Sequence, residues 1–368
     1  MKSLVMKYKL ICLLISASLL VACEKDPIDT KGNAISFNNS PARAAKVEAP
    51  NDNARMWAYY YNTDNSTTTT KMVYGTESAP ELATLSNINA SAGTAGLTIN
   101  GNTKYWFVGT YNFFSIYSDD FKNGNLSDAT TRLNTSTHTL TFNYDITNQK
   151  ELRYATALNE DGGNAITSDG ASNRTTSVEL TYKHLLSKIK FKGFSSVEGK
   201  DVQLIDITIG NLPQTATYTI VAPQSSTTPT VTLALGDAYT TLSYTGTTEL
   251  TAPEGGFKDE AGNTVTDPTE GFKYTSLISD GVFTLDNGLV FPMENPSSVT
   301  FTVRYLSADG KTIKTKSSTL PSTQQWEAGN SYIYTFYIQP SGPIIFGGVT
   351  VTPWNNQPET EFDFPTEP

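Results

Sequence analysis

The sequence predicts an all-β protein with two tandem β-sandwich domains behind an export signal. Three observations support this class: short segments alternate apolar and polar residues, clusters of Gly, Asn and Asp separate them, and long helical patterns are absent. Charged residues make up only 17% of the chain, whereas Thr, Ser, Asn, Gly and Tyr are abundant. Thr and Tyr suit half-exposed strand faces, and Gly and Asn suit turns, so the composition agrees with the pattern.

Residues 1–22 predict a lipoprotein signal peptide. A basic start precedes an apolar stretch, residues 10–21, which is too short to span a bilayer and leads into the lipobox Leu20-Val21-Ala22-Cys23. We expect cleavage before Cys23 and acylation of its sulfur and new amino group, with an uncleaved anchor or a chance cysteine in a plain signal peptide as the alternatives. The acyl chains would attach the protein to a membrane without a spanning helix. Because Cys12 leaves with the signal, the mature chain has one acylated cysteine and no disulfide.

The segment after the lipobox predicts a tether, a short strand and an exposed loop. Residues 24–33 read as a flexible tether, and residues 34–39 as a strand with Ile35 and Phe37 on one face. Small residues around Arg43, beside a proline, then form a loop of the kind that proteases cut.

Strand patterns recur from residue 56 onward. Residues 56–61, 105–108 and 113–117 are aromatic-rich strands, and residues 138–146 alternate with four apolar side chains inward. Those four are Leu140, Phe142, Tyr144 and Ile146. The apolar parity changes within residues 178–191, which predicts a bulge or kink near residues 184–187, where the chain passes from one domain to the next.

The second half repeats the strand pattern and ends in a separate strand. Alternation marks strands at four places, residues 205–209, 231–235, 299–305 and 332–338. Residues 340–343, Pro-Ser-Gly-Pro, cannot pair in a sheet centre. A last strand, residues 345–351, follows them with Ile345, Val349 and Val351 on one face. The predicted organisation is 1–22 signal peptide, 23–43 lipidated pro-segment, 44–187 N-terminal domain, 188–340 C-terminal domain, and 341–368 C-terminal strand and tail.

Charge and motifs argue against nucleic-acid binding and catalysis. The chain has 36 acidic and 26 basic residues, whereas nucleic-acid binding requires basic surfaces. The two histidines, His138 and His184, lie inside strand patterns, which favours structural roles. No G-x-S-x-G motif or metal-ligand spacing occurs, so we predict no catalytic residue, metal or cofactor.

Two weaker possibilities concern ligands. Acidic turns at residues 161–169 and 259–263 carry oxygen ligands for calcium, although a turn role is favoured. Aromatic side chains would stack on sugars if exposed, although packing in the sheets is favoured. These are Trp57, Tyr59, Tyr60, Tyr61 and Trp106.

Four segments in order resemble the fimbrillin family, the pilins of type V pili of anaerobic Gram-negative bacteria. The segments are the lipobox at Cys23, the strand-then-arginine segment 35–44, the run His184-Leu185-Leu186-Ser187-Lys188-Ile189-Lys190-Phe191, and the ending Trp326-x-x-Gly329-Asn330-x-Tyr332-x-Tyr334 with Val349-x-Val351-x-Pro353-Trp354.

The resemblance implies two transthyretin-like sandwiches and a structural pilin or adhesin, not an enzyme. It implies export as a surface-exposed outer-membrane lipoprotein, held to the membrane through lipid only, followed by incorporation into a fimbrium. A surface protease would cut between Arg43 and Ala44 and remove the pro-strand that carries Ile35 and Phe37. The C-terminal strand of a neighbouring pilin would fill the vacated groove, with donor residues Ile345, Val349, Val351 and Trp354. The expected partners are pilin subunits of the same or a related type, in a head-to-tail polymer, and a host or bacterial surface ligand.

One feature departs from the family's major stalk pilins, which continue with an apolar segment after the final Trp. Here the tail after Trp354 is acidic and interrupted by proline. An accessory, tip or anchor subunit is therefore an open alternative, as is a permanently lipidated surface glycan-binding protein. A lipid-anchored glycan hydrolase has no residue support beyond common carboxylates.

Overall fold

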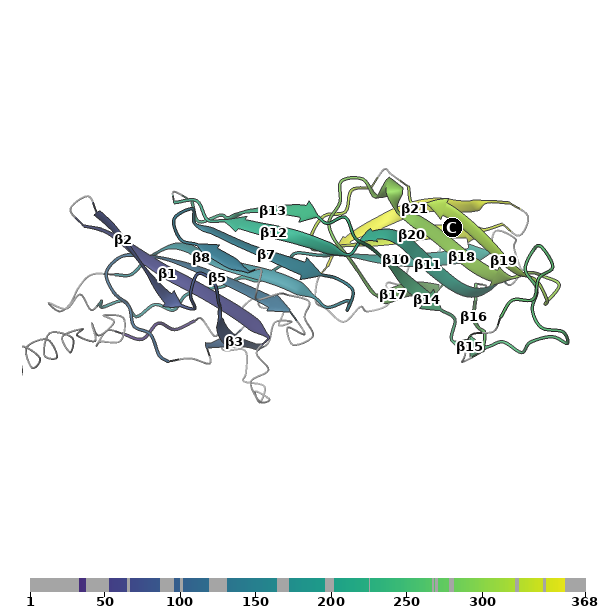
Figure 1. Cartoon of the computed structure of the whole chain (residues 1–368), viewed down its shortest axis with the longest axis horizontal. Helices are drawn as coiled ribbons and strands as arrows, with labels where there is room; N and C mark the ends of the chain where they lie inside the picture. The colour runs from purple at the N-terminus through teal and green to yellow at the C-terminus, as the bar shows by residue number, and fades with distance from the viewer. Residues whose placement is uncertain are drawn as a thin grey trace, which may run out of the picture.

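The computed structural model describes residues 33–37, 53–64, 67–86, 96–99, 102–118, 131–163, 172–195, 202–224, 226–266, 268, 271–277, 281–321, 324–339 and 342–354. Two β-sandwich units lie end to end along the long axis of the molecule (Figure 1). The predicted all-β fold is confirmed. In the described part of the chain, no helix is long and apolar enough to cross a membrane.

The N-terminal sandwich packs a seven-stranded sheet against a four-stranded sheet. The larger sheet has the order β4 (Gly96–Ile99), β3 (Glu81–Ser86), β1 (Ala54–Asp64), β5 (Thr110–Ser118), β8 (Leu152–Asp161), β9 (Lys183–His184), and β2 (Thr67–Tyr74) pairs with β1. The smaller sheet has the order β13 (Thr230–Leu235), β12 (Thr215–Val221), β7 (Thr139–Asp145), β6 (Arg132–Asn134). The predicted alternation of β7 is observed, since Leu140, Phe142 and Tyr144 are buried between the sheets.

The large sheet is covered on both faces. One face of β1, with Trp57 and Tyr59, packs in the core shared with the smaller sheet. The other face, with Met56 and Ala58, packs in a second core beneath irregular segments that include residues 33–37. This second core is the part of the fold that bears on assembly.

The C-terminal sandwich also consists of two sheets. The first has the order β17 (Gly281–Val290), β10 (Ser187–Ser195), β20 (Asn330–Ile338), β21 (Ile344–Pro353). The second has the order β15 (Thr248–Glu249), β16 (Lys273–Ser276), β11 (Gln203–Pro213), β18 (Thr300–Leu306), β19 (Ile313–Thr319), and β14 (Tyr239–Thr245) pairs with β11. A 3-10 turn, η3 (Pro296–Ser298), precedes β18. Aromatic side chains of β20, among them Tyr332, Tyr334 and Phe336, pack between these sheets.

The chain passes between the sandwiches where the sequence changes parity. His184 of β9 pairs with β8 in the N-terminal sandwich, whereas Ser187 begins β10 in the C-terminal sandwich. The chain returns once within residues 188–340, because the β12–β13 hairpin pairs with β7. The domain limits 44–187 and 188–340 remain a prediction. The β12–β13 hairpin lies within residues 188–340 but belongs to a sheet of the N-terminal sandwich.

Candidate functional site

Residues 33–37 lie between two other segments of the N-terminal sandwich and bond to both. On one side Ile35 N–H donates to Lys104 O at 2.8 Å, and Trp106 N–H donates to Asn33 O at 3.0 Å. On the other side Val178 N–H donates to Ser36 O at 2.7 Å. The segment therefore fills a slot in the layer that covers the seven-stranded sheet.

The side chains of this segment alternate between core and solvent. Ile35 is 7% exposed and Phe37 is 9% exposed, and both belong to the second core. The Phe37 ring centre lies 6.0 Å from that of Tyr74 and 5.9 Å from that of Phe113, the latter in an edge-on arrangement. Ser36 is exposed between them. Removal of this segment would leave an apolar trough with unpaired backbone groups on each side.

The walls of the slot are held by contacts that do not involve residues 33–37. Ser172 N–H donates to Trp106 O at 3.2 Å, which joins one wall to the other. The Arg174 guanidinium lies 4.0 Å from the Trp106 ring centre and pairs with Glu160 at 2.6 Å. These contacts join the two walls to each other and to β8 without the participation of residues 33–37.

The C-terminal strand β21 lies at a sheet edge. It pairs antiparallel with β20 alone among the described strands, from Asn330 opposite Pro353 to Ile338 opposite Ile344. Ile344 is buried, and Phe346 and Val349 pack partly against the C-terminal core. A strand bound along one edge detaches with the loss of one ladder only.

The expectation that Ile345, Val349 and Val351 share one face is wrong for Ile345. The pairing of β21 with β20 shifts by one residue at Gly347 and Gly348, a bulge that reverses the side-chain alternation. Ile345 therefore lies opposite Tyr337 on the outer face and is 41% exposed, whereas Val349 faces the core. Val351 is opposite Tyr332, on the side of Val349, and is 39% exposed.

The end of β21 contacts the other sandwich. Trp354 N–H donates to Gly329 O at 2.6 Å, and the Trp354 ring stacks on His184 of β9 with ring centres 4.2 Å apart. Nδ1 of His184 lies 2.7 Å from Oε1 of Glu151, which also forms an ion pair with Arg153. Burial raises the pKa of the Glu151 carboxyl, but these two partners outweigh it and hold the pKa below its ordinary value.

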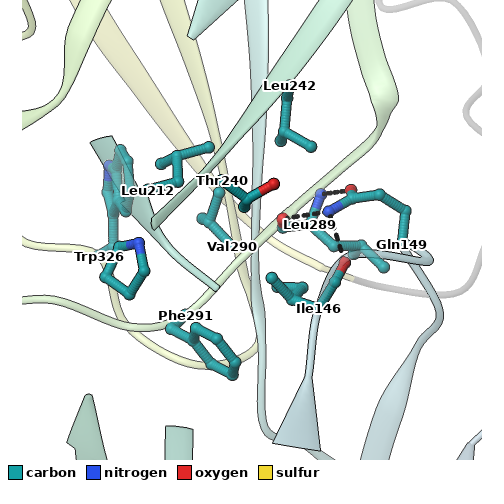
Figure 2. A pocket seen from close by; sticks show the side chains of 10 residues that line it. Ile146, Gln149, Leu212, Thr240, Leu242, Leu289, Val290, Phe291 and Trp326 are labelled. Atoms are coloured by element: carbon teal, nitrogen blue, oxygen red, sulfur yellow. Dashed lines mark hydrogen bonds between the residues drawn. The ribbon is translucent and has the colours of Figure 1, made fainter. Parts of the chain in front are cut away.

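Gln149 joins the two sandwiches beside this contact. Figure 2 shows its amide bonded to the backbone of Leu289, with Nε2 donating to the carbonyl at 3.0 Å and Oε1 accepting from the N–H at 2.8 Å. Leu212, Phe291 and Trp326 pack around the pair and leave no room for a water molecule. Around Gln149 the junction is therefore packed and holds no ligand cavity.

The other histidine, His138, is part of a buried polar network. Its Nδ1 is hydrogen bonded to the Tyr59 hydroxyl, and its Nε2 lies 2.7 Å from the Gln224 side-chain amide. Asn112 Nδ2 also donates to the Tyr59 hydroxyl, at 2.9 Å. Burial lowers the pKa of His138, so the neutral ring is the form that suits this network.

We expect the free energy of unfolding of the chain to fall as the pH drops below about 6.5, the ordinary pKa of histidine. Because burial lowers the pKa of His138 in the folded chain, the unfolded chain takes up the proton first, and the free energy of unfolding decreases as the pH falls. Urea unfolding from pH 7.5 to 5 measures it, with His138→Asn as control. Residue 138 has a positive φ of 55°, and Asn tolerates this conformation. An equal slope in both proteins would contradict the assignment.

The aromatic residues considered for sugar stacking are core residues. Trp57, Tyr59, Tyr60 and Trp106 are all buried, and Tyr61 packs partly against the core shared by the two N-terminal sheets. They are thus not available as a stacking platform in this fold.

The acidic turn at residues 259–263 is held by its own backbone. Oδ1 of Asp259 accepts from Ala261 N–H at 2.9 Å and from Asn263 N–H at 2.8 Å, which explains the acid as a turn residue. No group of three potential metal-ligating His, Cys, Asp or Glu residues occurs in the ranges that the structure describes.

Three predicted site residues are not among the described residues, and three contacts in the structure were not predicted from the sequence. Cys23, Arg43 and Ala44 lie outside the described residues, so lipidation and processing stay predictions. Sequence reasoning did not find the contacts of Gln149, Glu151 and Arg174, since no local pattern marks a residue whose partner is distant in the chain.

A family model described as fimbrillin-like matches residues 42–354. A candidate cell adhesion protein from Bacteroides uniformis is 15% identical with a TM-score of 0.45, and the match covers 88% of this chain and 97% of that one. A fimbrial protein from Bacteroides vulgatus is 14% identical with a TM-score of 0.46, covering 83% and 93%.

The fimbrial anchor protein Mfa2 from Porphyromonas gingivalis is 10% identical with a TM-score of 0.31, covering 88% of this chain and 97% of that one. No curated protein sequence matches the chain. The fimbrillin-like match spans most of the chain and includes two of the four segments on which the resemblance was based, residues 184–191 and 326–354, together with the end of the strand-then-arginine segment. The chain therefore belongs to the fimbrillin-like family.

Proposed function

We propose that this protein is a pilus subunit that is exported as a lipoprotein, cut after Arg43 and assembled by strand exchange. Family membership makes it a pilin-type structural subunit of cell-surface fimbriae and not an enzyme. The finer steps are our proposal. The observation that carries it is the position of residues 33–37, which bury Ile35 and Phe37 in a groove and bond through their backbone to both of its walls.

In this proposal the pro-strand protects the groove until the subunit reaches the surface. An open groove would expose apolar side chains and unpaired backbone groups on both walls, which favour uncontrolled aggregation. Proteolysis between Arg43 and Ala44 would separate residues 33–37, together with the lipid at Cys23, from the rest of the domain. The groove would then accept an extended strand of a second subunit by strand addition.

The strand that we propose as donor is β21. It has two apolar pairs spaced like Ile35 and Phe37, namely Ile344 with Phe346 and Val349 with Val351. In each pair both side chains face the same side of the strand, because they lie opposite alternate residues of β20. Repetition of this contact from subunit to subunit gives a head-to-tail fibre.

A polymerisation assay tests this proposal. The fragment beginning at Ala44 is expected to form ladders that dissociate only on heating, whereas the chain that keeps residues 24–43 stays monomeric. Removal of residues 344–368 would prevent ladders but would also remove a sheet strand.

A point variant therefore provides the sharper test. Val351→Asp places a charge on the proposed inserting face of β21, where the side chain is 39% exposed in the monomer, so the fold is retained and insertion is lost. Thr350→Asp, on the opposite exposed face, is the matched control. Equal polymerisation of the two variants would contradict the role of β21.

An anchor that keeps its lipid is the alternative, motivated by the acidic tail after Trp354. Mass spectrometry of the cell-surface form separates the two roles. A new N-terminus at Ala44 supports the polymerising subunit, whereas lipidated Cys23 on every copy supports the anchor.

A further inference from the structure

The contact of Trp354 with His184 joins the end of β21, an edge strand of the C-terminal sandwich, to the N-terminal sandwich. β21 pairs with β20 in the C-terminal sandwich, yet the Trp354 ring packs against the core of the N-terminal sandwich. The two rings lie nearly parallel, at 20°, with centres 4.2 Å apart. Overlap of this kind is a specific aromatic contact.

The surface under the indole is rigidly built. His184 is held by the Glu151 carboxylate at 2.7 Å, and Glu151 is itself held by the buried Arg153. The carbonyl of Gly329 accepts from Trp354 N–H, while its own N–H donates to Leu186 O at 2.9 Å. Gly329 has a φ of 78°, a conformation that other residues rarely adopt. We call His184, Glu151 and Gly329 together the indole seat.

The position of the seat along β21 matters because edge strands detach from their ends. At its N-terminal end β21 is continuous with the chain that leads from β20, and Ile344 is buried there. Its other end, at Pro353, is exposed and leads directly into Trp354. The Trp354 contact is therefore placed to hold the C-terminal end of β21.

We propose that the indole seat is an intramolecular docking site for Trp354 that keeps β21 in its own subunit and limits how often the strand is released. The use of that release for assembly rests on the function proposed above. The seat itself is a property of the monomer and is tested there.

Hydrogen exchange of the uncleaved monomer tests the seat. Trp354→Ala and His184→Ala are each expected to speed exchange of the β21 amides by about tenfold, because each change removes the same aromatic pair. Trp354→Phe is expected to speed it less, and exchange in β12 should not change. Tyr239→Ala, which removes an exposed ring elsewhere, is the control.

The double variant shows whether the two rings act together. If they form one latch, Trp354→Ala with His184→Ala exchanges no faster than either single variant. Circular dichroism measures whether each variant is folded. If an alanine variant is not folded, exchange of the β21 amides in Trp354→Phe tests the seat instead. Unchanged β21 exchange in every folded variant would overturn the seat.

Assembly is measured in a separate experiment, so that failure of the indole-seat proposal and failure of the strand-donation proposal give different results. In the fragment beginning at Ala44, His184→Ala leaves the donor strand intact and is expected to raise the initial rate of ladder formation by about the factor seen in exchange. Faster exchange with no ladders in any protein would support the seat and overturn strand donation. Ladders that form at an unchanged rate, despite faster exchange, would overturn the control of assembly by the seat.

Discussion

Phe37→Ala is expected to release residues 33–37 from the groove in the uncleaved chain. Truncation of a buried phenylalanine costs about 3 kcal/mol, and here the loss falls on a short segment with few other anchors. The ratio of docked to undocked segment should therefore fall roughly 100-fold. Exchange of the Val178 amide, which donates to Ser36 O, measures this loss, and binding of an apolar dye reports the opened trough.

Ser36→Ala is the matched control for this variant. Ser36 is exposed and its hydroxyl pairs only with that of Ser177, at 2.8 Å, so the change should cost less than about 0.5 kcal/mol. Equal exchange of Val178 in the two variants would mean that backbone bonds, and not the aromatic side chain, hold the segment.

Arg153→Met is expected to lower the free energy of unfolding by about 3–5 kcal/mol. Arg153 is only 2% exposed and forms an ion pair with Glu151, which is also largely buried. Without the guanidinium the carboxylate keeps the cost of burial and loses a main stabilising partner. Urea unfolding at neutral pH measures the change.

The double variant Glu151→Gln with Arg153→Met separates charge from packing. Because it removes both charges, it should be more stable than Arg153→Met alone. A double variant no more stable than the single one would show that Arg153 acts through packing, for example against Tyr117, whose ring centre lies 5.9 Å away.

The strand pattern was predictable because side-chain alternation is a local property. The inward faces of β7 and of residues 35–37 followed from residues two positions apart, and the structure buries both sets. The same reasoning failed at Ile345, because one extra residue in the ladder at Gly347 and Gly348 reverses the alternation. Two adjacent glycines were the available signal for that bulge.

The site was less predictable than the fold. The apolar pair Ile35 and Phe37 was visible in the sequence, but the walls that receive it come from residues 102–107 and 172–178. The aromatic residues at 57–61 looked equally suited to a surface or a core, and coverage of both faces of the seven-stranded sheet decided for the core. Each of these outcomes depends on which segments meet in space.

By itself, the sequence determined the β class, many of the strands, the apolar alternation of residues 35–37 and, through four spaced segments, the resemblance to the family. Each of these rests on local patterns of residues close together in the chain. Only the tertiary structure decided that β12 and β13 return to the N-terminal sandwich, that Gln149 joins the two sandwiches and that Trp354 rests on His184. Those contacts join residues up to 170 positions apart, and no local periodicity encodes such a pairing.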